Sequence, residues 1–284
     1  METPRNIWLI VNEASGSNDP VAIEQVVSAL EGAGIAPARV IRVPHDELPD
    51  RAELESHGVD ALVTFTGDGT ANAVVTRLEG WGGVVLVLPG GTQNLLARSL
   101  HGESDAASII AAFGRGELAM TRRHLIRSRH GDGLCEIVAG PGAKWSEVRE
   151  ALRNGAVGDM ATAAGEAISG TAGGARVTVI DPAVGLDDGY PAVRLHPVDD
   201  EIAIDGYTAE TIGDFALQGL AILQRDFRTG PHDELGLHRE VLCRSSEPIE
   251  LMIDGERATG GVEERFLIAP CEVTLLASVG KDPE

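Results

Sequence analysis

The sequence of 284 residues is poor in cysteine, aromatic residues and positive charge. Its three cysteines, Cys135, Cys243 and Cys271, are too scattered for a disulfide framework or a zinc site, so we expect reduced thiols in a cytoplasmic protein. Lys and Arg number 23 against 44 Asp and Glu, and the net charge of −21 argues against a nucleic-acid-binding surface. Aromatic residues make up 4% beside 35 glycines, which predicts an aliphatic core with many tight turns.

Long hydrophobic runs are also missing. No apolar stretch approaches the ~20 residues of a membrane-spanning helix, and the first residues are too weakly apolar for a signal peptide. We therefore expect no transmembrane segment. The length suits two packed domains, which we place at residues 1–118 and 119–284, with the extreme C-terminus free to return to the first domain.

The first domain alternates short β-branched runs with longer patterned segments. The predicted strands cover residues 6–12, 38–44, 60–65 and 83–88. Between the first two, residues 19–30 have apolar side chains at helical spacing, with Asp19 as the expected N-cap and Pro20 in the first turn. This alternation predicts an α/β fold with a mostly parallel sheet and flanking helices, and a ligand site at the carboxyl ends of the strands.

From about residue 120 the pattern changes to short strands separated by turn residues. The predicted strands lie at residues 133–139, 175–180, 201–204 and 250–253, which indicates a second, mostly antiparallel β domain. Residues 155–174 are rich in Ala, Gly and Thr, and the pattern fits either a closely packed helix or a flap. An exposed edge strand in this domain would allow a homodimer.

A glycine-rich turn follows the third predicted strand. Residues 61–72 read ALVTFTGDGTAN: a buried strand, a turn with a glycine on each side of Asp68, and a helix that we expect to begin near Ala71. Such a turn allows close backbone approach, and the helix start offers amide groups to a phosphate. The spacing matches neither the P-loop nor the dinucleotide fingerprint. An ordinary turn between strand and helix is the alternative.

Two further polar turns follow predicted strands, with NEASG at residues 12–16 and PGGTQN at residues 89–94. Parallel strands bring such turns to one edge of a sheet, where adjacent glycine turns can hold a polyphosphate without a lysine. The candidate nucleotide-binding residues are Asn12, Ser15, Gly16, Thr66, Gly67, Asp68, Gly69, Thr70, Asn72, Gly90, Gly91, Thr92 and Asn94.

The order NxxSG, GDGT and PGGTxN resembles the diacylglycerol kinase catalytic-domain family, which includes bacterial lipid kinases and sphingosine kinases. The GDGT-type loop also occurs in NAD kinases and phosphofructokinases, and the early PGGTxN favours the lipid kinases. The resemblance implies an N-terminal α/β domain that binds ATP and Mg²⁺, and a C-terminal β-sandwich that binds the acceptor. It further implies transfer of the γ-phosphate to a hydroxyl of a diacylglycerol-like or sphingoid-like lipid, by a cytoplasmic protein acting peripherally at the membrane surface.

The resemblance extends to residues 249–258, IELMIDGERA, which are similar to the family's strand followed by DGE. It implies that Asp254 is the general base for the acceptor hydroxyl, with Glu256 as the acid beside it. It also implies that Asp68 holds Mg²⁺ or helps to deprotonate the acceptor. From the residues alone, Asp-Gly between two β runs is equally typical of a hairpin turn.

The sequence departs from the family at four positions. Thr66 replaces a leading glycine, Ala73 and Leu95 stand where Glu and Asp are usual, and Lys144 lies near the place of an Asp. Two alternatives to a lipid kinase stay open. The shared GDGT-type loop allows a kinase of a soluble hydroxyl compound such as NAD, and Ala73, Leu95 and Lys144 suggest a nucleotide-binding regulatory protein with impaired catalysis.

Overall fold

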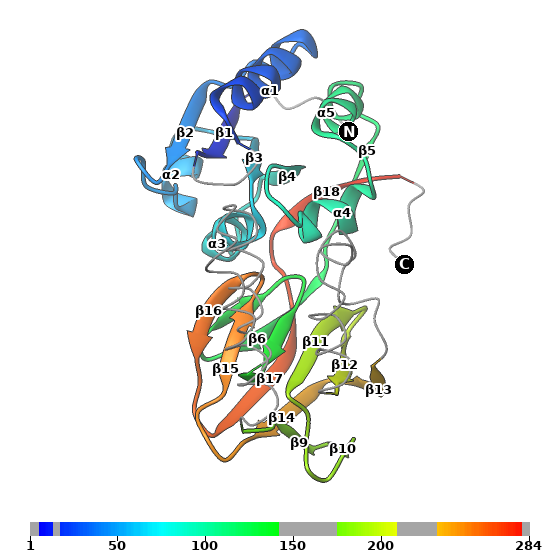
Figure 1. Ribbon diagram of the computed structural model, residues 1–284. Coiled ribbons are helices and arrows are strands. Elements are labelled where there is room, and N and C mark those ends of the chain that lie inside the picture. The colour runs from blue at the N-terminus through cyan, green and yellow to red at the C-terminus, as the bar shows by residue number, and fades with distance from the viewer. Residues whose placement is uncertain (1–5, 14–17, 142–174, 209–231, 280–284) are drawn as a thin grey trace, which may run out of the picture. The chain divides into compact units, whose positions relative to one another are not determined.

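The computed structural model describes residues 6–13, 18–141, 175–208 and 232–279, which form two compact units (Figure 1). The first unit is drawn from Met1–Arg123 and Pro270–Glu284, and the second is His124–Ala269. The chain therefore leaves the first unit after Arg123 and returns to it at Pro270.

In the first unit, the described residues form one six-stranded sheet and five helices. The helices are α1 (Pro20–Gly32), α2 (Arg51–Ser56), α3 (Asp68–Arg77), α4 (Leu95–His101) and α5 (Ala106–Gly114). The strands are β1 (Ile7–Asn12), β2 (Arg39–Val43), β3 (Ala61–Thr66), β4 (Val84–Pro89), β5 (Leu118–Thr121) and β18 (Thr274–Ser278). Their order is β2-β1-β3-β4-β18-β5, parallel except for β5, so the last described strand of the chain lies between β4 and β5. The predicted strands and first helix are confirmed.

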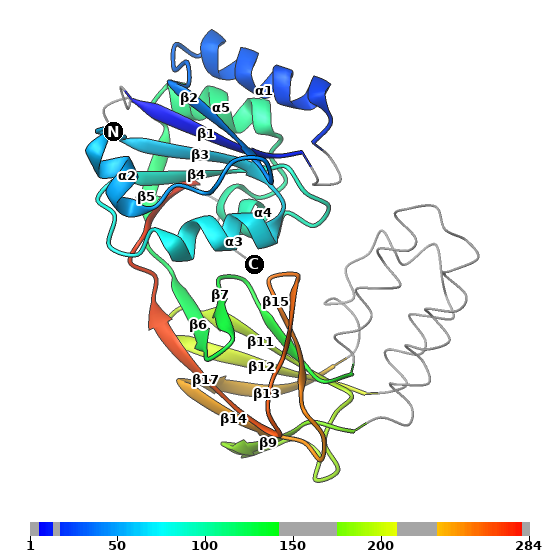
Figure 2. The ribbon, with the colours of Figure 1, turned by 90° about the vertical axis from the view of Figure 1, so that its left-hand side faces the viewer.

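Helices cover both faces of this sheet, with α1 and α5 on one side and α3 and α4 on the other (Figure 2). Ile23 of α1 and Phe113 of α5 pack against Leu9, Val63 and Leu86 of the strands in the main apolar cluster. Because β1, β3 and β4 are parallel, the turns that follow them all leave the same edge of the sheet.

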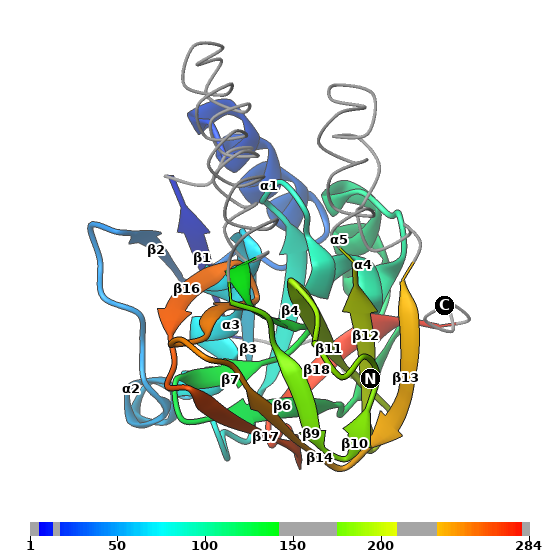
Figure 3. The same cartoon turned by 60° about the horizontal axis from the view of Figure 1, so that its bottom comes forward.

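The described residues of the second unit form two six-stranded sheets. One has the order β10-β9-β14-β17-β6-β7, with β6 (His124–Ser128), β7 (Gly131–Gly133), β9 (Thr178–Asp181), β10 (Ala183–Val184), β14 (Glu240–Arg244) and β17 (Glu263–Pro270). The other has the order β13-β12-β11-β8-β15-β16, with β8 (Ile137–Ala139), β11 (Ala192–Val198), β12 (Glu201–Tyr207), β13 (Asp233–His238), β15 (Glu250–Ile253) and β16 (Glu256–Thr259). In the second sheet β11, β12 and β13 lie side by side (Figure 3).

The two sheets of the second unit share one apolar core, as in a β-sandwich. Val179, Val241 and Phe266 of one sheet pack in the same cluster as Leu195 and Ile204 of the other. The predicted fold class, an α/β domain followed by a β-sandwich, is thus confirmed.

Two local predictions are wrong. Helix α3 begins at Asp68, not near Ala71, because the backbone turns helical directly after Gly67 and the Ala71 amide already donates to the Gly67 carbonyl at 3.0 Å. The run 133–139 is not one strand, because β7 ends at Gly133 and β8 begins at Ile137. Residues 155–174 lie outside the described residues. Among the described residues, no helix has the length and apolar character needed to cross a bilayer.

Candidate functional site

Three of the predicted motif turns are joined by hydrogen bonds in the first unit. Asn12, at the end of β1, donates from Nδ2 to Oγ1 of Thr70 at 2.8 Å. The Leu96 amide, in the first turn of α4, donates to Oδ1 of Asp68 at 3.2 Å. Residues from NxxSG, GDGT and the segment after PGGTxN, which are far apart in sequence, therefore meet at one edge of the sheet.

Glycines let the second and third motif turns touch through their backbones. A Cβ on Gly90 would lie 2.5 Å from the amide nitrogen of Thr66, and one on Gly91 would lie 2.5 Å from Cα of Gly67. These distances are far shorter than ordinary van der Waals contact, so any side chain would push the turns apart. Gly90 and Gly91 are thus required for the shape of the site.

The start of α3 differs from the starts of α1, α2 and α5. Those three helices have Asp19, Asp50 and Asp105 as N-caps, whose carboxylates each accept a hydrogen bond from a first-turn amide. The N-cap of α3 is Gly67, which has no side chain to offer the first-turn amides. An anion at this point would complete the helix end and meet the positive end of the helix dipole. The glycine turns and this helix start fit the phosphates of a nucleotide.

Asn94 shapes the PGGTQN turn from within. Its backbone is left-handed, with φ of 53°, a conformation that asparagine tolerates better than most residues. Its side chain accepts a hydrogen bond from the Gly91 amide at 2.6 Å and donates to the Gly91 carbonyl at 2.9 Å. Thr92 is exposed at the tip of the turn. The side chain of Asn94 therefore closes the turn by its two hydrogen bonds to Gly91. Direct contact of Thr92 and Asn94 with a nucleotide stays a prediction.

Asp68 is the candidate metal ligand and lies partly buried in the first turn of α3. Its Oδ1 accepts the Leu96 amide, which fixes the carboxylate beside the third motif. Among the described residues, no group of three or more His, Cys, Asp or Glu side chains could hold a metal ion. Mg²⁺ in phosphoryl transfer is usually bound by one or two carboxylates together with the phosphates themselves, so a single Asp fits this ion.

Sequence reasoning missed Asn18 in this site. Its side chain is 3% exposed, and Nδ2 donates to the carbonyls of Phe65 at 2.7 Å and Asn12 at 3.2 Å. Asn18 thereby ties the end of β1 to the end of β3. The one local signal is the position of Asn18, a polar residue directly before Asp19 and Pro20. From this segment we predict only that Asp19 caps the helix, and not that Asn18 links two strands. Ser15 and Gly16 lie outside the described residues.

The DGE motif of the second unit is a tight hairpin turn. Asp254 and Gly255 join β15 to β16, and Ile253 pairs with Glu256 across the turn. Both turn residues have positive φ, 44° and 91°, as in a type I′ turn, for which Asp-Gly is a preferred sequence. The hairpin interpretation of these residues is therefore correct for the backbone.

The side chain of Asp254 is buried and bound on both oxygens. It is 1% exposed, and Oδ2 accepts the Leu134 amide at 2.7 Å while Oδ1 accepts the amides of Cys135 at 3.0 Å and Glu136 at 2.8 Å. Three such bonds stabilise the ionised carboxylate and fix the turn between β7 and β8. Glu256, by contrast, is exposed. The general-base role of Asp254 stays a prediction. The structure shows in addition that its carboxylate holds the backbone of residues 134–136 by hydrogen bonds.

Comparison with known proteins identifies a domain and a fold. Residues 6–122 match the family model described as the diacylglycerol kinase catalytic domain. A search of curated proteins found no match. A crystal structure described as a diacylglycerol kinase from Bacillus anthracis str. Sterne matches with a TM-score of 0.65 at 16% identity, over 98% of this chain and 99% of that one.

Two further structures from the same organism, whose names mark the diacylglycerol kinase activity as provisional, match with TM-scores of 0.63 and 0.62. Each is 16% identical and covers 98% of this chain and 99% of its own. At this identity the likeness shows the fold. The resemblance inferred from the three motifs is thus confirmed: residues 6–122 match the diacylglycerol kinase catalytic domain, and nearly the whole chain has the fold of solved structures that bear this name.

Proposed function

We propose that the chain is an ATP- and Mg²⁺-dependent kinase that transfers the γ-phosphate to the hydroxyl of a diacylglycerol-like or sphingoid-like lipid. The observation that supports it most is the backbone contact between the GDGT and PGGTxN turns beside the start of α3. In this proposal the first unit binds the nucleotide and the second binds the acceptor.

On the nucleotide side, the chain supplies positioning. The first-turn amides of α3 and the Gly90–Gly91 turn would bind the phosphates, and Asp68 would hold Mg²⁺. Bound Mg²⁺ would neutralise charge on the phosphates. The Asn12 to Thr70 and Leu96 to Asp68 hydrogen bonds keep these groups in place before any ligand arrives.

On the acceptor side, the two acids of the DGE turn have different settings. Asp254 accepts three amides, whereas Glu256 is exposed. In this proposal Asp254 holds the turn and is the general base for the acceptor hydroxyl, with Glu256 as the acid beside it.

To phosphorylate a lipid in a bilayer, the protein needs a surface that can bind to the bilayer. The net charge of −21 repels anionic lipid, so the face that meets the bilayer must be locally basic or apolar. Association with liposomes is expected to persist when salt is raised if that face is apolar. No association at any salt concentration would count against a bilayer-resident acceptor.

The test is transfer of labelled γ-phosphate from ATP, with Mg²⁺, into a total lipid extract and separately into NAD. The variant Asp68→Asn keeps an oxygen for the Leu96 amide and removes the charge that would hold Mg²⁺. The matched control is Asp105→Asn, an exposed N-cap on α5. We expect label in the lipid phase with wild type and control, and a loss of about a hundredfold or more with Asp68→Asn.

The other outcomes contradict the proposal in different ways. Label in NAD alone would make the acceptor soluble. Label in neither pool, while ATP still binds to the folded protein, would favour the regulatory alternative suggested by Ala73, Leu95 and Lys144. Full activity of Asp68→Asn would remove Asp68 from the metal site.

A further inference from the structure

A cluster of charged side chains lies in the second unit, outside the chemistry proposed above. It consists of Glu136, Arg194, His196, Asp205 and His232, called here the Arg194 cluster. Arg194 is at its centre, donating from Nε to Oε2 of Glu136 at 2.9 Å and from Nη1 to Oδ2 of Asp205 at 3.1 Å. His196 lies 3.3 Å from Oδ2 of Asp205, and His232 lies 3.7 Å from its Oδ1.

The cluster occupies the face of its sheet that points away from the sandwich core. Val193 and Leu195 of β11 belong to the core, as do Ile204 of β12 and Ile137 of β8, so Arg194 and Asp205 alternate to the opposite face. In spite of this position, Glu136 is only 1% exposed and Asp205 6%. Two carboxylates are thus held largely out of water, which is costly unless a cation is bound to each.

The pKa of Asp205 shows that its partners outweigh its burial. Burial acts to raise this pKa, but the hydrogen bond from His196 and the charges of His196, Arg194 and His232 hold it below its usual value. The carboxylate is therefore ionised and bound to Arg194, which fixes one end of the guanidinium. With Nη1 held by Asp205, the same guanidinium binds the Glu136 carboxylate through Nε.

Glu136 connects this anchor to the DGE turn. Its amide donates to Oδ1 of Asp254 at 2.8 Å, and its carbonyl accepts the Asp254 amide at 3.1 Å. One residue thus binds Arg194 through its side chain and Asp254 through both of its backbone groups. A shift of the Glu136 backbone would therefore affect both of its hydrogen bonds with Asp254.

We propose that Arg194 is a positioning residue for the acceptor-side turn. By holding the Glu136 carboxylate, it keeps residues 134–136 in the conformation in which their three amides bind Asp254, and so fixes the hairpin that presents Glu256. The effect on turnover rests on the proposed function, whereas the effect on residues 134–136 does not.

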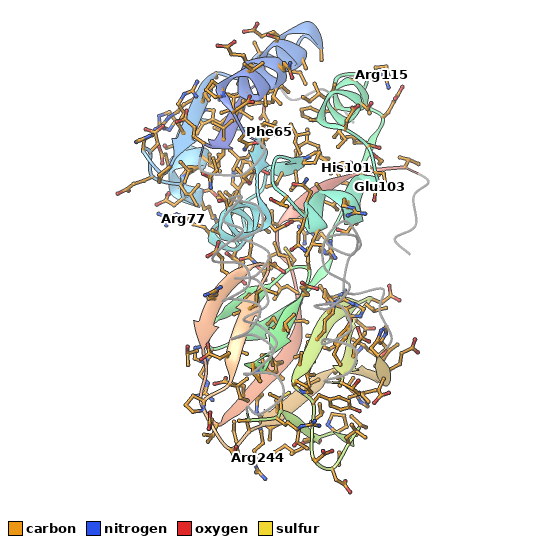
Figure 4. The ribbon with its side chains drawn as sticks, in the orientation of Figure 1. Phe65, Arg77, His101, Glu103, Arg115 and Arg244 are labelled. Atoms are coloured by element: carbon orange, nitrogen blue, oxygen red, sulfur yellow. The ribbon has the colours of Figure 1, made fainter. Side chains whose placement is uncertain are left out.

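The experiment compares Arg194→Met and Arg194→Lys in the full chain. Methionine keeps much of the length and removes the charge, and lysine keeps the charge but loses the planar fork that reaches two carboxylates. The matched control is Arg244→Met on β14, in an exposed ion pair with Glu263, where the arginine points away from the unit (Figure 4). Amide hydrogen exchange over residues 134–136 is the first readout, and kcat and KM for ATP and lipid are the second.

We expect exchange at residues 134–136 to become about tenfold faster or more in Arg194→Met, less so in Arg194→Lys, and not at all in Arg244→Met. We expect kcat to fall about tenfold or more with KM for ATP unchanged, because the nucleotide turns lie in the other unit. Adding Glu136→Gln to Arg194→Met removes the charge that lacks its partner, so this double variant should regain most of the protection.

Unchanged exchange at residues 134–136 in folded Arg194→Met would overturn the proposal. So would equally faster exchange throughout the second unit, since that would show a general loss of stability. If Arg194→Met does not fold, Arg194→Lys and the double variant test the proposal instead, again by the exchange rates at residues 134–136 and in the rest of the second unit. Absence of phosphoryl transfer by wild type would defeat the proposed function alone, because exchange would still report whether Arg194 holds the turn.

Discussion

The GDGT turn of the first unit and the DGE turn of the second contain the same dipeptide, Asp-Gly, in opposite settings. Asp68 and Gly69 lie in the first turn of a helix whose N-cap is a glycine, so no cap side chain accepts a hydrogen bond from the first-turn amides. Asp254 and Gly255 form a hairpin whose carboxylate already binds three amides of its own unit. The first-turn amides of α3 thus receive no negative charge from a cap side chain, whereas the amides of residues 134–136 receive it from Asp254.

This difference separates two ways in which a motif residue can matter. A residue that leaves backbone donors available affects binding when it is changed, with little effect on folding. A residue that satisfies buried donors affects folding first, and catalysis only through it. The predictions below test this division.

The largest loss of stability is expected for Asp254→Ala. It leaves the buried amides of Leu134, Cys135 and Glu136 without their acceptor and places alanine at a positive φ, so the free energy of unfolding should fall by about 4 kcal/mol. Urea denaturation of the full chain, followed by a probe in the second unit, measures it.

Asp254→Asn separates the two causes of this loss of stability, which are the missing acceptor and the alanine at a positive φ. Asparagine tolerates the left-handed backbone, so this variant removes only the carboxylate. It should lose less stability than Asp254→Ala while still lacking one acceptor oxygen. If Asp254→Ala were as stable as wild type, the three amides would not depend on this carboxylate, and the contrast between the two turns would disappear.

The next largest effect is expected for Gly91→Ala. Its Cβ would lie 2.5 Å from Cα of Gly67, where only backbone can yield, so the unfolding free energy should fall by about 3 kcal/mol and nucleotide affinity about tenfold or more. Gly82→Ala is the matched control, because no atom lies within 4 Å of its Cβ. Calorimetric titration with ATP and Mg²⁺ measures the affinity, and equal binding by both variants would show that the turn contact is not needed.

Much of the first unit follows from its sequence because its signals are local. Asp19 before Pro20 predicts the start of α1, and β-branched runs between glycine turns predict four strands of the sheet. The position of α3 was predicted three residues late because Asp68 and Gly69 are poor helix formers. In the structure Gly67 is the N-cap and Asp68 lies in the first turn, where a carboxylate is favoured by the helix dipole.

What the sequence could not show depends on contacts between distant residues. Nothing near Asp254 indicates that amides more than a hundred residues earlier bind its side chain, and nothing near Asn18 indicates its bond to Phe65. The Arg194 cluster likewise combines strands whose pairing no local pattern specifies. The motifs therefore predict candidate positions for the sites, and tertiary hydrogen bonds determine how each acid is held in the fold.

A smaller effect, with a distinct pH dependence, is expected for Asp205→Asn. The bonds to Arg194 and His196 favour the ionised carboxylate, so the variant should be about 2 kcal/mol less stable near pH 7. Because the pKa of Asp205 is lowered in the folded protein, its contribution is complete above the ordinary value of 3.8 and is lost as the pH falls through the lower folded value. Denaturation curves between pH 3 and pH 7 should converge for wild type and variant only at the acid end. A constant difference across that range would contradict the assignment.

The smallest effect is expected for Asp105→Ala, which tests the first unit away from the nucleotide turns. Asp105 caps α5 by accepting the Ser108 amide at 2.7 Å, and this bond holds the pKa of the carboxyl below its usual value. Loss of an exposed N-cap should lower the unfolding free energy by about 1 kcal/mol. ATP affinity should not change, because α5 packs on the opposite face of the sheet from α3 and α4. A drop in affinity with the cap removed would mean that helix ends throughout the first unit influence the nucleotide site, so that the lack of a side-chain cap would no longer distinguish α3 from α1, α2 and α5.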